Sequence, residues 1–190
     1  CYASAGIVSA TSFFGDGAGL SGISAGGLLE KWDQAVDNTE YANNAGTTWT
    51  AIQGNNLEVQ LTPTNTSDRI CVMFNWGSIS SSDSSCLGYG KIMRDIGGNG
   101  YADLTIGTDS GGNGQAQFAL NLQGNQYEVD AGLCCSFIDH PNTTSQVTYR
   151  PYFRCEAGGG IVYLNRNVRN GTNDISGVSW AWGLQLSNNS

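Results

Sequence analysis

The chain has 190 residues and a formal net charge of −8, with 13% charged residues and 27 glycines. Sparse charge and a glycine share about twice the usual ~7% exclude a typical helical bundle and favour a β protein with many turns. The eight Lys and Arg residues form no basic stripe and no apolar run has the length of a membrane-spanning helix, so we expect neither nucleic acid nor membrane as a partner.

Residues 1–27 form a distinct glycine-rich segment without helical periodicity, and we recognise no signal peptide in it. A single copy would bury little of such a segment, yet it carries more apolar side chains than a free linker. We therefore predict an extended fibre segment that becomes ordered on neighbouring copies. Its candidate oligomerisation residues are Ile7, Phe13, Phe14, Leu20 and Ile23. Residues 28–190 are predicted to form one β domain.

The stretch from Leu28 to Tyr41 is the one candidate helix. Its apolar residues Leu28, Leu29, Trp32 and Val36 are spaced so that they would share a helix face. A single helical turn or a loop is an equally good interpretation.

From about residue 47 the period changes to two, which predicts strands. Leu57, Val59 and Leu61 alternate with polar residues, and Pro63 ends that strand. The continuous apolar run 69–76 predicts a strand buried on both faces. Further strands are expected at 86–94, 101–106 and 115–122, separated by glycine turns.

The last third alternates most clearly, with predicted strands at 127–137, 147–155, 161–164 and 180–186. Pro151 predicts an edge position or a bulge. Trp180 and Trp182 share a face with two leucines, which indicates a core or a trimer interface. Eight or nine short strands with turns between them predict an antiparallel β-sandwich that resembles a jelly roll.

The six cysteines are Cys1, Cys71, Cys86, Cys134, Cys135 and Cys155. They form no C-x-x-C pair and His140 is the only histidine, so we expect no metal site and no cofactor. Reduced, buried cysteines are the favoured interpretation. If one bridge forms, Cys71 with Cys86 is the candidate disulfide.

The residues Asp139, His140, Asn142 and Thr143 belong to a phrase that joins two alternating strands, and its residue types favour a structural turn. The alternative is a recognition loop. We therefore name these four residues as candidate surface-recognition residues, and we add Trp32 and Trp49, which lie outside the strong strands.

No nucleophile motif accompanies His140, which we expect to be exposed, and we predict no catalytic residue. Carboxylate pairs such as Asp130 with Asp139, or Asp103 with Asp109, keep a glycan depolymerase as the enzymatic alternative.

Residues 136–167 (SFIDHPNTTSQVTYRPYFRCEAGGGIVYLNRN) resemble the C-terminal domain of tail-fibre and appendage proteins of tailed phages, particularly cyanophages and other marine phages. Residues 61–74 and 91–96 are similar to upstream phrases of that domain. Residues 10–23 are similar to a Gly-Asp-Gly module of phage fibres. The C-terminal phrase 179–190 departs from the family pattern, and the cysteine count exceeds it.

The resemblance implies a non-enzymatic structural protein of the virion, assembled in the host cytoplasm. It also implies a homotrimer that contacts other virion proteins or a host surface glycan. A capsid decoration or head-fibre protein is the alternative within the particle.

Overall fold

The secondary structure of the chain is β-strand and loop wherever the structure describes it. The computed structural model describes residues 29–43, 47–51, 57–81, 87–104, 118–121, 133–155, 162–166 and 177–187. In this part of the chain no helix is long and apolar enough to cross a membrane. The predicted segment 1–27 and its five candidate oligomerisation residues lie outside the described residues.

Two larger antiparallel sheets make up most of the fold. The four-stranded sheet has the order β1, β13, β5, β10, and the six-stranded sheet has the order β3, β11, β7, β8, with β4 also pairing with β11 and β9 with β7. The strands of the first sheet are β1 (Leu29–Asp37), β5 (Arg69–Trp76), β10 (Leu133–Asp139) and β13 (Ser179–Leu186). Those of the second are β3 (Thr50–Ala51), β4 (Val59–Leu61), β7 (Leu87–Ile96), β8 (Ala102–Asp103), β9 (Phe118–Asn121) and β11 (Val147–Cys155).

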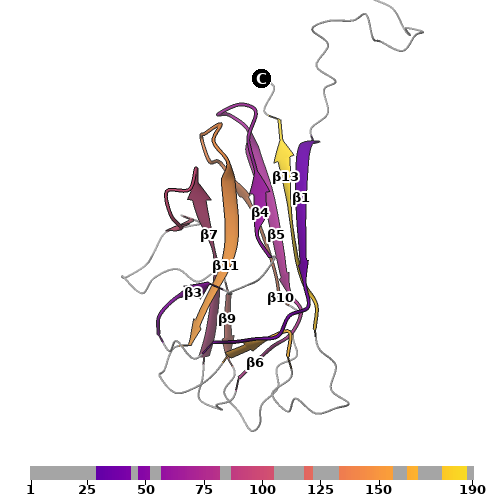
Figure 1. Ribbon diagram of the computed structural model, residues 1–190, viewed down its shortest axis with the longest axis vertical. Helices are drawn as coiled ribbons and strands as arrows, with labels where there is room; N and C mark the ends of the chain where they lie inside the picture. Colours follow the sequence, from indigo (N-terminus) through magenta and orange to yellow (C-terminus); the bar gives the residue numbers. More distant parts are fainter. Residues whose placement is uncertain are drawn as a thin grey trace, which may run out of the picture.

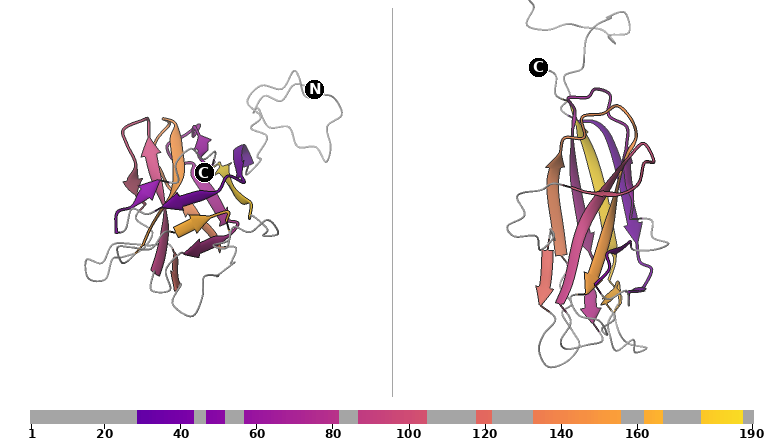
Figure 2. Two further views of the ribbon diagram at one scale, coloured as in Figure 1. Left: turned by 60° about the horizontal axis from the view of Figure 1, so that its bottom comes forward. Right: turned by 90° about the vertical axis from the view of Figure 1, so that its left-hand side faces the viewer.

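The two larger sheets form two layers whose strands run along the long axis of the molecule (Figure 1 and Figure 2). A third, small sheet has the order β2 (Tyr41–Asn43), β12 (Val162–Leu164), β6 (Ile79–Ser81). Its strand β6 lies at the lower end of the layers in Figure 1.

The main strands pair in a nested order. Strand β1 pairs with β13, β4 with β11, β5 with β10, and β7 with β9, and every pair is antiparallel. The first main strand is thus matched with the last, the second with the second last, and so on inward. The chain doubles back between β7 and β9, and its two halves then run side by side through both layers.

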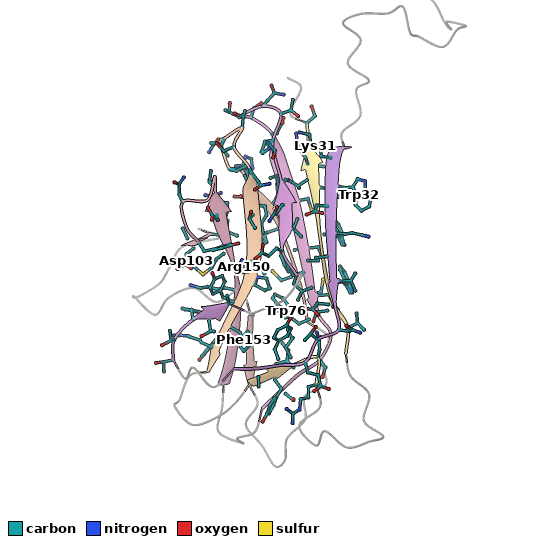
Figure 3. All side chains as sticks on the ribbon, in the orientation of Figure 1. Lys31, Trp32, Trp76, Asp103, Arg150 and Phe153 are labelled. Atoms are coloured by element: carbon teal, nitrogen blue, oxygen red, sulfur yellow. The ribbon has the colours of Figure 1, made fainter. Side chains whose placement is uncertain are left out.

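Apolar side chains of both layers fill the space between them. The ring of Phe137 on β10 meets the ring of Tyr149 on β11 at 6.2 Å, edge to face, so this contact joins the two layers. Trp76 and Phe153 also lie between the layers (Figure 3). Each fully buried large apolar side chain contributes about 1.5–3 kcal/mol relative to an exposed one. Other members of this core are Val59, Leu61, Ile70, Val72, Phe74, Ile92 and Val147.

The helix considered for residues 28–41 is not formed, because this stretch is the edge strand β1 followed by β2. Strand β1 pairs with β13 over almost its whole length. The Asp33 carboxylate also accepts the backbone N–H of Gln60 on β4 at 2.7 Å, which ties β1 to the opposite layer. These long-range bonds outweigh a weak local helical pattern.

Strand β5 has the predicted bounds, but the prediction that it is buried on both faces is wrong. Ile70, Val72 and Phe74 are buried, whereas Cys71 and Met73 are half-buried on the outer side. The described part of the chain covers the inner face of the four-stranded sheet and leaves the outer face open.

Pro151 is buried in β11, an interior strand, so the predicted edge position is wrong. It lies opposite Ile92 of β7. On the other side of β11, strand β4 pairs with residues 147–149 and β3 with residues 152–153. Pro151 therefore falls between these two short partners, where its missing N–H removes no bond from either pairing.

Candidate functional site

The outer side of the six-stranded sheet carries a cluster of aromatic and cationic side chains. The alternation of β7 and β11 points these side chains away from the core, because their neighbours Ile92, Tyr149 and Phe153 point inward. We call this surface the aromatic-cationic face. Its members are Trp49, Tyr89, Lys91, Tyr101, Arg150, Tyr152 and Arg154.

Trp49 is held by two cations of this face. The Lys91 ammonium lies 4.3 Å from the centroid of the Trp49 ring, and the Arg154 guanidinium lies 5.0 Å from it. Lys91 is buried, and it also forms an ion pair with Asp103. The buried stem and two partners fix Lys91, so Trp49 has a defined place over the sheet.

Arg150 anchors the centre of the face. Its guanidinium lies 4.4 Å from the centroid of the Tyr101 ring and pairs with Glu58. Tyr101 in turn meets Tyr152 with ring centroids 5.8 Å apart in a tilted arrangement. Burial raises the pKa of Tyr101 to about 12, with smaller contributions from Tyr152 and Asp95. Tyr101 therefore stays a neutral hydrogen-bond donor at ordinary pH.

The charge on this face differs from that of the whole chain. Three of the eight basic residues, Lys91, Arg150 and Arg154, stand on it, in a chain of net charge −8. Two of them pair with acids, so the face is close to neutral and rich in rings and donors. Arg150 Nε and Arg154 Nε are buried and have no hydrogen-bond partner among the described residues, so a ligand would meet the outer edges of these guanidinium groups. Such a surface suits a polar ligand with flat, ring-shaped parts.

The two tryptophans named from the sequence stand on different sheets. Trp49 is half-buried on the aromatic-cationic face, whereas Trp32 is 62% exposed on the outer side of β1. In Figure 3 Trp32 points away from the layers, on the side opposite Asp103. The structure therefore does not bring these two candidate residues together.

The residues from Asp139 to Thr143 do not form one recognition surface either. The Asp139 carboxylate points inward, where it accepts hydrogen bonds from Arg94 at 2.8 Å and from the Tyr149 hydroxyl at 2.7 Å. His140 is exposed, as expected. Asn142 has φ of 52° and donates from Nδ2 to the His140 carbonyl at 3.2 Å, which is turn chemistry.

Of the acid pairs considered for glycan cleavage, Asp130 and Asp109 lie outside the described residues. Their proposed partners are occupied: Asp139 binds Arg94, and Asp103 binds Lys91. The part of the chain that the structure describes holds no cluster of three or more metal-ligating side chains.

The predicted disulfide between Cys71 and Cys86 is not formed, because Cys71 is a free thiol. Cys71 lies on β5 between Ile138 and Leu184 of the neighbouring strands. Cys86 is outside the described residues and precedes β7, a strand of the other sheet. Cys134 is also a free thiol.

Sequence reasoning missed most of the aromatic-cationic face. The signal was present in β11, where Arg150, Tyr152 and Arg154 alternate with the inward residues. What the sequence does not reveal is that Trp49 and Tyr101 come from distant stretches to cover these side chains.

Comparison with models of protein families finds no matching family, and comparison with curated proteins finds no matching relative.

Proposed function

We propose that this chain is a structural module of a tailed-phage particle, a trimeric tail-fibre or appendage domain. It acts by binding other surfaces and catalyses no reaction. The observation that carries the proposal is the aromatic-cationic face, whose rings and guanidinium donors are fixed in place and turned outward. The resemblance of residues 136–167 to phage appendage domains supports it. This phrase supplies the end of β10, the turn after it, and β11 and β12.

We infer further that the two layered sheets are a jelly-roll-like sandwich. The nested pairing of the first main strand with the last, and of each next strand with its counterpart, is what a doubled chain rolled into two sheets requires. Such a scaffold holds its outward side chains on paired strands, which are rigid enough to keep a recognition surface in one shape.

The ligand that fits the aromatic-cationic face best is a host surface glycan. Sugar rings offer apolar faces that pack on Tyr and Trp rings, and hydroxyl groups that accept from Arg donors. Single contacts of this kind are weak, and three copies in one assembly would make them strong through effective concentration.

The place in the particle is tested by immunogold labelling of purified virions with an antibody to this chain. We expect label on the tail or its appendages, and a solution mass of about three times the 20.0 kDa of one chain. Label spread over the capsid at high copy number would replace the tail assignment by capsid decoration. A chain absent from virions would overturn the proposal.

Glycan binding is tested by calorimetry with purified host envelope polysaccharide. We expect Tyr152→Ala and Arg154→Ala to weaken binding about tenfold or more, because both remove outward groups of the face. Ser67→Ala, in the exposed turn between β4 and β5, lies on neither face and is the control that should bind normally. Release of oligosaccharides during incubation would instead identify a depolymerase.

A further inference from the structure

The outer side of the four-stranded sheet carries a group of exposed and half-buried apolar side chains. Trp32, Val36 and Ile138 are 62%, 59% and 54% exposed, and they project from the two edge strands β1 and β10. Between them, Trp180, Trp182 and Leu184 of β13 are half-buried. We call the surface made by these six residues the apolar face.

The large side chains that β13 contributes to the apolar face cannot turn to the inner side of the strand. The inward residues of that strand are small or polar, namely Ser179, Ala181, Gly183 and Gln185. The backbone at Gly183 approaches the opposite layer so closely that even a methyl group would collide with it. A one-residue slip of β13 would bring its tryptophans inward but would break this fit. The large apolar side chains are therefore committed to the outside.

The low charge of this face favours contact between copies of the chain. Among the described side chains that point outward from these four strands, Arg69 at the start of β5 is the one charged group. The chain carries sixteen acids, and like-charge repulsion would oppose self-association wherever acids meet. None of the described side chains that point outward from these strands is acidic, so three copies can meet around one axis through this face without that repulsion.

The dimensions of the face also fit a subunit contact. At ~4.8 Å between strands and ~3.4 Å per residue, four strands of about eight residues give a footprint of roughly 19 by 27 Å. This is about 500 Å² in projection, so the face can supply the greater part of a standard subunit contact, which buries about 800 Å² of accessible surface on each partner. A surface of this extent is at the upper end of the apolar patches that monomers expose, and such patches commonly mark an interaction site.

We propose that the apolar face is the contact through which copies of this chain associate. The inference rests on the self-association in the proposed function and assigns it to a surface. A copy of the chain covers Trp32, Val36 and the β13 side chains of its neighbour. The aromatic-cationic face, on the other layer, stays turned outward.

The test uses the full chain and two substitutions on the exposed edge of the face, Trp32→Glu and Val36→Glu. Both positions are exposed in one copy, so the fold should survive, which circular dichroism checks. Sedimentation over a concentration series should give an oligomer for the parent chain and a dissociation constant about tenfold or more higher for each variant. Gln60→Glu adds the same charge to an exposed position of β4 and should leave the oligomer unchanged.

Cys134 gives a second readout, because this native thiol is exposed on the outer side of β10. Its alkylation should be slow in the oligomer and fast in Val36→Glu. Cys135 is the internal comparison, since it points inward and burial raises its pKa to about 11.

The outcomes separate the inference from the proposed function. An oligomer that persists in both variants with a reactive Cys134 would overturn the assignment of the surface and leave self-association standing. A monomer at all concentrations would overturn both the contact and the trimer. A monomer whose Cys134 is alkylated slowly would overturn the inference, because residues 1–28 of the same chain would then be what covers the apolar face.

Discussion

Gly183 on β13 lies directly against Val59 on β4, in the opposite layer. A Cβ atom at Gly183 would come to 2.5 Å from Val59 Cγ1 and to 3.0 Å from Leu61 Cδ1. Both partners are buried, and the branched Val59 side chain has little rotamer freedom. The two layers can come this close here because Gly183 has no side chain.

We predict that Gly183→Ala lowers the free energy of unfolding by about 1–3 kcal/mol, because an added methyl group overpacks the core. Urea unfolding followed by tryptophan fluorescence measures it. Val59→Ala in the same chain opens room for the methyl group, so the double variant should lose less stability than the two single losses combined. Strict additivity would contradict the close approach.

Asn165 joins three parts of the fold from a buried position. Its Nδ2 donates to the carbonyls of Asp37 at 2.9 Å and Thr39 at 3.1 Å, and its Oδ1 accepts from the Ser179 hydroxyl at 2.6 Å. Its φ of 56° is in the left-handed region, which Asn tolerates better than most residues. The side chain thus holds the β1–β2 corner against the start of β13.

We expect Asn165→Ala to cost about 3 kcal/mol or more, since it leaves buried polar groups without partners and strains the backbone. Asn165→Gly loses the same hydrogen bonds and accepts the positive φ. It should therefore be more stable than the alanine variant by about 1 kcal/mol. Thermal and urea unfolding of both variants measure the difference, and equal stabilities would argue against backbone strain at this residue.

The raised pKa values of three tyrosines predict that the protein loses stability at high pH. Burial raises the pKa of Tyr41 and of Tyr101 to about 12, and burial together with the Asp139 carboxylate raises the pKa of Tyr149 well above its usual range. In the unfolded chain a tyrosine loses its proton near pH 10. Above about pH 10 the folded state therefore binds more protons, and the free energy of unfolding falls as pH rises.

Urea midpoints from about pH 8 to about pH 11 test this, with the tyrosinate absorbance of the folded protein as a second readout. Tyr149→Phe removes one titrating group, so its stability should fall less steeply over the same range. It should start lower at neutral pH, because the hydrogen bond to Asp139 is lost. An unchanged slope would mean that Tyr149 ionises in the folded state as it does in the unfolded chain.

The parts of the fold predicted best from the sequence are those where one strand face is apolar and the other polar. Strand β11 has its predicted bounds, because Val147, Tyr149 and Phe153 alternate with polar residues and no other register buries them. The same rule leaves β13 open between a core and a trimer interface for its tryptophans, and in the structure they point outward while the small residues point inward. Alternation shows that a strand has two different faces, but it does not show which of them points to the core. At β13 the opposite layer decides this, because Val59 lies so close to Gly183 that only small residues fit on the inner face.

The site was harder to predict than the strands. The sequence indicates Trp49 as a surface residue because it lies outside the strong strands, but its partners Lys91 and Arg154 come from strands far along the chain. Asp139 was named as a surface residue from its turn, and it is instead bound by Arg94, which is 45 residues away. Local turn chemistry identifies a bend and does not reveal which side chains of other strands reach into it.

The turn between β4 and β5 offers a last prediction, since one carboxylate organises it. Asp68 Oδ2 accepts the backbone N–H groups of Thr64 at 3.0 Å and Asn65 at 2.7 Å, and the side-chain amide of Gln185 at 2.9 Å. Asp68 is 1% exposed, so these donors would lose a buried acceptor if the carboxylate were removed.

We predict that Asp68→Ala lowers the free energy of unfolding by about 2–4 kcal/mol, because it removes several charge-assisted hydrogen bonds at once. Asp68→Asn keeps one neutral acceptor and should lose about half as much. Hydrogen exchange should quicken at the amides of Thr64 and Asn65 in both variants, more so in the alanine variant. Ser67→Ala, at the exposed neighbouring position, is the matched control and should leave stability and exchange nearly unchanged. If Ser67→Ala were as destabilising as Asp68→Ala, the turn would depend on its general conformation and not on the Asp68 carboxylate.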